Sequence, residues 1–245
     1  MPVVQPEDMT RLRRYQTRFA LVVVAVLLIS AAAGFGYIFS LPGVGDTEAP
    51  LVHRILAEHH AAFTTLPPPS KLGAAVVMVE GEHFCSNIFA DIVYGAGRAV
   101  LASSANGDPG GSTIAQQVAK QLYTDGSGLG AALEDLGLAV KLSLQYSRPQ
   151  VLDMWLNAVY YGNGYWGAEA PAEGYFGVSP RSLDWAEAAM LAGLPQAPSA
   201  YDPLVHLALA RQRQLHVIAQ LVATHTISQS QANAAIREKL RFRRS

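Results

Sequence analysis

The chain has 245 residues, of which 50% are apolar and 15% are charged, and its formal net charge at pH 7 is −1. A chain this apolar is not intrinsically disordered, and its length is enough for one large core or at most two small domains. The near-neutral charge argues against a nucleic-acid-binding surface, so we expect no such partner. The single cysteine, Cys85, excludes an internal disulfide framework and a cysteine-based zinc site.

The amino-terminal segment predicts a membrane anchor. Residues 1–18 include four arginines, whereas residues 19–39 contain no charged side chain. The second stretch would rise roughly 31 Å as a helix, about the thickness of the hydrocarbon core of a bilayer. Because arginine clusters stay in the cytoplasm, we expect a cytoplasmic tail over residues 1–18, a transmembrane helix over residues 19–41, and the remainder on the outer face. A cleaved signal peptide is the alternative, although its apolar core would be shorter, roughly 7 to 15 residues.

Helical patterns dominate the rest of the sequence. The spacing of apolar residues predicts a first helix over residues 51–63 and a longer one over residues 204–222. Ser147 followed by an early proline, and Asp184 three residues before Glu187, are typical of helix starts. Alternating patterns that would predict strands are nearly absent.

These patterns predict one mostly α domain after the anchor, over residues 46–236. A domain of this length lies within the usual size range. A basic tail over residues 237–245 carries four arginines, and we expect it to be solvated and disordered.

The first candidate for chemistry is Glu80, which ends the apolar run of residues 76–79. A carboxylate in such a setting suits a general base or a general acid. The alternative is a solvated glutamate where the element reaches the surface, and for one glutamate in isolation this alternative is the commoner one.

The second candidate is the segment of residues 110–120, in which two glycines lead into Ser112 and Thr113. Thr113, Gln117 and Lys120 share one helix face, because they are spaced i, i+4 and i+7. A hydroxyl, an amide and an ammonium group on one face can hold a sugar and a phosphate. A solvated polar face is an equally good interpretation of the composition.

The third candidate is the aromatic segment of residues 155–164, which contains Trp155, Tyr160 and Tyr161. Aromatic rings stack on sugar faces, but aromatics at helical spacing are more often part of a core.

Together the three segments resemble the bacterial peptidoglycan glycosyltransferases, or transglycosylases. Residues 111–120 match the second motif of that family and residues 148–162 its fourth motif. The resemblance covers roughly residues 50–225, and the monofunctional biosynthetic enzymes are the closer match. It implies a lysozyme-like helical domain on a single N-terminal transmembrane helix, which polymerises lipid II into glycan strands.

The resemblance also implies roles for particular residues. Glu80 aligns with the general base, which accepts the proton of the attacking sugar hydroxyl as undecaprenyl pyrophosphate leaves, and Asp135 aligns with a second catalytic carboxylate. Six positions align with substrate-binding residues: Ser112, Thr113, Gln117, Lys120, Asn157 and Tyr160.

The sequence departs from the family pattern at positions that include Gly81, Asn87, Phe89, Ala131 and Ala132. The two alanines replace a pair of cations in the third motif that would face the pyrophosphate. Each lost transition-state contact lowers a rate by about a hundred- to a thousandfold, so we expect weak activity. The alternative function is a catalytically impaired relative that binds lipid II or glycan strands as a partner of the wall-synthesis machinery. A lysozyme-like hydrolase is a third class, which needs two suitably spaced carboxylates and a water.

The expected partners are lipid II, the lipid-linked glycan chain and the membrane, with penicillin-binding proteins and divisome or elongasome proteins as candidate protein partners. We predict no metal site and no required cofactor; Mg²⁺ or Mn²⁺ at Asp135 is an alternative source of positive charge. The expected location is the bacterial cytoplasmic (inner) membrane, as a single-pass protein with its catalytic domain on the periplasmic side.

Overall fold

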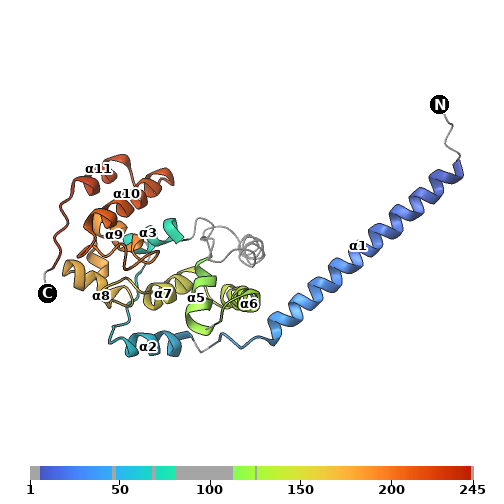
Figure 1. Ribbon diagram of the computed structural model, residues 1–245, viewed down its shortest axis with the longest axis horizontal. Coiled ribbons are helices and arrows are strands. Elements are labelled where there is room, and N and C mark those ends of the chain that lie inside the picture. The colour runs from blue at the N-terminus through green and yellow to red at the C-terminus, as the bar shows by residue number, and fades with distance from the viewer. Residues whose placement is uncertain (1–5, 46–47, 68–69, 81–112, 125, 244–245) are drawn as a thin grey trace. The chain divides into compact units, whose positions relative to one another are not determined.

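The structure is a computed structural model of the chain, and it describes residues 6–45, 48–67, 70–80, 113–124 and 126–243. The chain divides into two units, Met1–Pro42 and Gly43–Ser245 (Figure 1).

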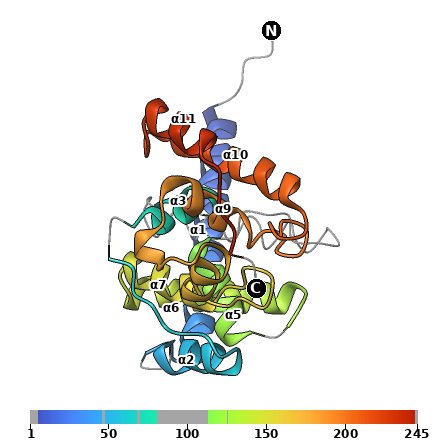
Figure 2. The ribbon, with the colours of Figure 1, turned by 90° about the vertical axis from the view of Figure 1, so that its left-hand side faces the viewer.

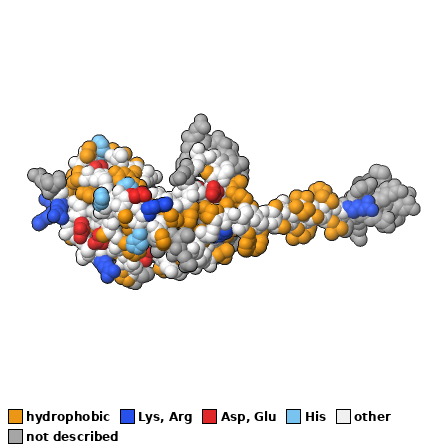
Figure 3. Space-filling view, turned by 90° about the horizontal axis from the view of Figure 1, so that it is seen from below, with side chains coloured by type: hydrophobic (Ala, Val, Ile, Leu, Met, Phe, Trp, Pro, Cys, Tyr) orange, Lys and Arg blue, Asp and Glu red, His pale blue; other side chains and the backbone are white. Residues whose placement is uncertain are grey.

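The first unit consists of one helix, α1, Pro6–Ser40. Within the described residues, one helical stretch is long enough and apolar enough to cross a membrane. It spans Arg18–Ser40 and has 23 residues. Apolar side chains cover most of this helix (Figure 3). The predicted apolar N-terminal helix is therefore present, and it is a candidate transmembrane span.

The second unit is built from helices. Their bounds are α2 (Glu48–Glu58), α3 (Lys71–Glu80), α5 (Ile114–Tyr123), α6 (Leu129–Gln145), α7 (Arg148–Ala158), α8 (Glu169–Pro171), the π-helical turn η1 (Ala172–Phe176), the 3₁₀ turn η2 (Pro180–Ser182), α9 (Trp185–Gly193), α10 (Leu207–Ala223) and α11 (Gln229–Arg237). In the described part of the chain, the only β pairing is an isolated bridge between Tyr160 and Trp166. The mostly α fold class predicted from the sequence is confirmed.

The helices of the second unit form two groups (Figure 2). In one group, α9 packs against α3 and α10; in the other, α5 packs against α6 and α7, and α7 also packs against α2. The interior of the first group is tight where α9 ends, because a Cβ atom on Gly193 would lie 2.8 Å from Cγ of Arg213. Glycine at this position therefore lets α10 lie close to α9.

Two helices begin where the sequence predicts. The backbone N–H of Ser147 donates to Oε1 of Gln150 at 2.9 Å, one residue before α7 begins. At the start of α9, the N–H of Asp184 donates to Glu187 at 3.0 Å, and the N–H of Glu187 donates back to Asp184 at 2.8 Å. This is a capping box, which satisfies backbone donors that lack partners within the helix.

Helix α2 ends earlier than the predicted residue 63. His60 has φ 52°, in the left-handed region, and the N–H of Ala61 donates to the carbonyl of Leu56 at 2.7 Å. This is the bonding pattern of a helix that stops at a left-handed residue. The apolar spacing continues to Phe63, so the sequence pattern did not reveal the stop.

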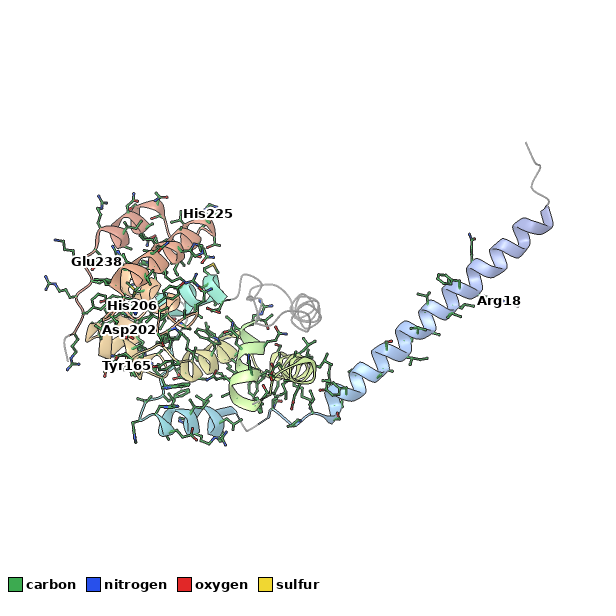
Figure 4. All side chains as sticks on the ribbon, in the orientation of Figure 1. Arg18, Tyr165, Asp202, His206, His225 and Glu238 are labelled. Carbon is green, nitrogen blue, oxygen red and sulfur yellow. The ribbon has the colours of Figure 1, made fainter. Side chains whose placement is uncertain are left out.

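Helix α10 begins later than the predicted residue 204. Oδ1 of Asp202 accepts the N–H of Leu204 at 2.9 Å, and its carbonyl accepts the N–H of His206 at 2.7 Å. The resulting turn, labelled by Asp202 and His206 in Figure 4, keeps residues 203–206 out of the helix.

The prediction of a disordered tail is wrong for residues 238–243. The ring of Phe242 lies 5.6 Å from that of Phe176, and the N–H of Arg243 donates to the carbonyl of Tyr175 at 2.8 Å. The tail therefore packs on the π-helical turn η1, while the side chains of Arg241 and Arg243 are exposed, as expected for a solvated basic segment.

Candidate active site

Glu80 is the last residue of α3, and its side chain is half-buried. The helix is held in place by Leu72, Ala75 and Val76, all of which are fully buried. A carboxylate at the C-terminal end of a helix lies near carbonyl groups with a partial negative charge, which is electrostatically unfavourable. A compensating donor is present, because Nε2 of Gln117 donates to Oε2 of Glu80 at 2.9 Å.

Gln117 lies on α5, so this hydrogen bond joins the two groups of helices. The start of α5 is fixed by a capping box, in which Oγ1 of Thr113 accepts the N–H of Gln116 at 3.2 Å and the Gln116 side chain accepts the N–H of Thr113 at 3.0 Å. The predicted polar face of this helix therefore does meet Glu80, through Gln117.

The Gln117 amide has a second partner in α7. Nε1 of Trp155 donates to Oε1 of Gln117 at 2.7 Å, and the Trp155 side chain is buried. A buried indole N–H usually finds an acceptor. The sequence interpretation placed Trp155 in a core or against a sugar and did not predict its role as a hydrogen-bond donor. A tryptophan expected to be buried is itself a sign that an acceptor lies near its indole N–H.

Tyr161 belongs to the same aromatic segment, but the sequence assigned it no specific role. It is fully buried, and its hydroxyl has no hydrogen-bond partner among the residues that the structure describes. Burial and, to a smaller extent, the negative charge of Glu80 raise the pKa of Tyr161 above its usual range. The phenol is therefore neutral, and it lies close enough to Glu80 to be affected by its charge.

Lys120 lies further along α5, and Asp135 lies on the next helix, α6. The Lys120 side chain is exposed, one helical turn beyond Gln117. Asp135, on α6, accepts a hydrogen bond from the hydroxyl of Thr124. Burial raises the pKa of Asp135 above its ordinary value, although the Thr124 hydrogen bond and the charge of Lys120 act in the opposite direction. An ammonium group thus lies near a partly desolvated carboxylate on the α5 side of the site.

The two carboxylates have different partners in and after α5. Glu80 accepts a hydrogen bond from Gln117 within α5, and Asp135 accepts one from Thr124, the residue that follows the end of α5. The two predicted catalytic residues are therefore held at separate positions along this part of the chain.

Asn157 does not fit its predicted contact with substrate. It is fully buried, and its side chain accepts the N–H of Thr64 at 2.9 Å and donates to the carbonyls of Thr64 at 2.8 Å and Asp153 at 2.7 Å. Every one of these partners is a backbone group. Asn157 therefore holds the segment that leads into α3 against α7.

Tyr160 lies in a different environment from Glu80. Its hydroxyl accepts the N–H of Gly164 at 3.0 Å, and its ring is 5.1 Å from that of Trp166, which in turn stacks on His59, just after the end of α2, at 4.1 Å. The remaining predicted binding residue, Ser112, lies outside the described residues, as do Gly81 and Asn87.

The first two turns of α6 carry Ala131 and Ala132, both half-buried, where the family pattern has cations. Among the described residues, no three His, Cys, Asp or Glu side chains are grouped as metal ligands. We derive no step through a metal ion.

A half-buried carboxylate beside a helix that bears an amide and an ammonium group provides the kinds of group that general base catalysis and charge stabilisation use. Residues 51–222 match the family model described as Transglycosylase. The chain belongs to the family of bacterial peptidoglycan transglycosylases.

Known relatives are longer proteins. Penicillin-binding protein 1A of Neisseria lactamica is 34% identical over 194 residues, which is 78% of this chain and 24% of the relative. Penicillin-binding protein 2D of Bacillus subtilis is 34% identical over 170 residues, covering 69% of this chain and 25% of the relative. The chain thus spans about a quarter of the length of these relatives. The crystal structure of penicillin-binding protein 1A from Haemophilus influenzae is 26% identical, with a TM-score of 0.39, over 53% of this chain and 17% of that one.

Proposed function

We propose that the protein polymerises lipid II into the glycan strands of peptidoglycan, with Glu80 as the general base. Membership of the transglycosylase family supports glycosyl transfer. The observation that carries the assignment of the base is the hydrogen bond from Gln117, which holds the half-buried carboxylate of Glu80 on the side of α5 that also bears Lys120.

In the proposed reaction, the 4-hydroxyl of the incoming lipid II sugar attacks the anomeric carbon of the lipid-linked chain. The new bond is a glycosidic C–O bond, and the bond between the anomeric carbon and the pyrophosphate oxygen breaks. Glu80 takes the hydroxyl proton, and the pyrophosphate leaves with the bonding electron pair. Among the described residues, Oε1 of Glu80 has no hydrogen-bond partner, so we assign proton acceptance to this oxygen.

Lys120 is the proposed electrostatic partner of the departing pyrophosphate. It is exposed and lies on the same helix as Gln117. Lys120 lies within electrostatic range of Asp135, whose pKa its charge lowers in part. Since Ala131 and Ala132 supply no further cation, we propose that turnover is slow, by about a hundredfold for each transition-state contact that is lost.

The candidate transmembrane span gives this reaction its location. Both substrates carry a lipid tail, so an enzyme anchored by α1 meets them on one membrane surface. The arginines before residue 19 favour a cytoplasmic amino terminus. We therefore propose a single-pass protein of the inner membrane whose domain faces the periplasm.

The test is polymerisation of fluorescent lipid II by the full chain in detergent, with and without Mn²⁺. The variants are Glu80→Gln and, as a matched control, Glu58→Gln. Glu58 is exposed, and its Oε1 lies 3.9 Å from Nε of Arg54. We expect polymer from the wild type and from the control, and none from Glu80→Gln.

The alternative function predicts a different result. The absence of positive charge at Ala131 and Ala132 favours a relative that binds lipid II without turnover. In that case no polymer forms under any condition, and the wild type and Glu80→Gln bind lipid II equally. Release of soluble muropeptides from isolated sacculi would instead indicate a hydrolase.

A further inference from the structure

The carboxylate of Glu80 is the end of a chain of two hydrogen bonds that starts in the core. The indole of Trp155 donates to Oε1 of Gln117 at 2.7 Å, and Nε2 of Gln117 donates to Oε2 of Glu80 at 2.9 Å. These two hydrogen bonds connect three helices, since Trp155 lies on α7, Gln117 on α5 and Glu80 on α3.

The chemistry of the indole gives this chain a direction. A side-chain amide has a donating end and an accepting end, and rotation by 180° exchanges them. The indole N–H can only donate, so it requires the amide oxygen of Gln117 to face it. The NH₂ group of Gln117 is then turned towards Glu80. In the reversed orientation two acceptor oxygens would face each other, and the carboxylate would lose its donor.

The indole is itself held rigidly. Trp155 is 2% exposed, and both of its neighbours in sequence, Met154 and Leu156, are also buried. The start of α7 is fixed by the contact between Ser147 and Gln150. A donor on a rigid element positions its partner more accurately than a donor on a mobile side chain does.

We propose that Trp155 is a positioning residue for the general base: its indole N–H fixes the Gln117 amide so that an N–H group faces Glu80. This inference rests on the proposed function, in which Glu80 accepts a proton through Oε1. Holding Oε2 by a single donor leaves Oε1 aimed at the substrate, and Trp155 does this without touching the substrate.

The kinetic test uses the full chain and fluorescent lipid II. Trp155→Phe removes the N–H but keeps an aromatic ring, and Trp185→Phe makes the same change at the half-buried first residue of α9. We expect Trp155→Phe to lower kcat by about 10- to 100-fold with little change in KM, because the base is misaligned while substrate contacts remain. The Trp185→Phe variant should keep wild-type kcat.

A double variant distinguishes positioning from a general loss of packing. Gln117→Met removes both amide contacts at similar size. If the indole acts through the amide, Trp155→Phe combined with Gln117→Met is no slower than Gln117→Met alone. Multiplication of the two losses would overturn the inference, as would a wild-type kcat for Trp155→Phe.

A spectroscopic readout is independent of activity. The chain has three tryptophans, so ¹⁵N-tryptophan labelling gives three indole N–H signals, and Trp155→Phe identifies the relevant one. We expect Gln117→Met to move this signal upfield and to speed its exchange with solvent; an unchanged signal overturns the inference. A wild-type chain that makes no polymer refutes the proposed function, whereas an active wild type matched by Trp155→Phe refutes only the role of Trp155.

Discussion

Replacing Asn157 with alanine distinguishes a structural role for this residue from the substrate contact that the family resemblance implies. The side chain is fully buried, and its three hydrogen bonds all reach backbone groups. Two of those groups, the N–H and the carbonyl of Thr64, lie 93 positions away in the sequence. Alanine would leave both without their side-chain partner.

The magnitude follows from these two groups. An unsatisfied backbone group in a protein interior costs about 1–3 kcal/mol. Because the Thr64 contacts are only partly buried, we take the lower part of this range and expect Asn157→Ala to lower the free energy of unfolding by about 2–4 kcal/mol. For a domain of this size, the melting temperature should fall by about 4–15 °C.

The assay is thermal unfolding of the full chain, with lipid II kinetics on the same samples. Thr64→Ala is the matched control, because Thr64 contributes to these bonds through its backbone only, and it should melt close to the wild type. An Asn157→Ala variant that melts like the wild type but has a KM for lipid II raised about tenfold would refute the structural assignment and restore a binding role.

Three further variants test the candidate active site and the turn at Gly162. Glu80→Gln removes a charge from the C-terminal end of α3 while its amide oxygen still accepts from Gln117, so we expect activity about 10²- to 10⁴-fold lower with a melting temperature equal to or slightly above that of the wild type. Asp135→Asn should raise the melting temperature at pH 7: the raised pKa of Asp135 gives stability that is present below its ordinary value of 3.8 and lost as the pH rises. Gly162→Ala should lower the urea midpoint, because Gly162 has φ 87° and a Cβ atom there would lie 2.9 Å from the carbonyl oxygen of Pro198.

Each of these variants has a discriminating outcome. A large drop in melting temperature for Glu80→Gln would mean that the carboxylate stabilises the fold, and Glu58→Gln provides its reference. For Asp135→Asn, the rise in melting temperature over the wild type must shrink as the pH falls towards 4. A rise that does not depend on pH would contradict the inference that burial raises the pKa of Asp135. Gly164→Ala is the reference for Gly162→Ala: its φ is 80° but nothing lies within 4 Å of the added Cβ atom, so its smaller loss should report backbone strain alone.

The sequence predicted the features that depend on short segments. The helix start at Ser147, the capping box at Asp184, the apolar helix before residue 41 and the shared face of Thr113, Gln117 and Lys120 each follow from residues within about one or two turns of one another. The mostly α fold class follows from the same local patterns.

What the sequence could not predict depends on contacts between distant elements. Helical spacing says which residues share a face, but not which neighbour that face meets. Asn157 and Trp155 lie two residues apart in one motif, yet one is bound to the backbone of Thr64 and the other to Gln117. The stop of α2 similarly depends on the backbone angle of His60, which apolar periodicity does not encode.

Helix α7 contacts both the segment that leads to Glu80 and the residue that donates a hydrogen bond to it. Asn157 and Asp153 accept hydrogen bonds from the backbone N–H groups of Thr64 and Leu66, in the segment before α3. Trp155, on the same helix, donates to Gln117 of α5. The same helix therefore fixes both the segment that leads to Glu80 and, through Gln117, the hydrogen-bond donor to Glu80. A displacement of α7 would move the base and its donor together.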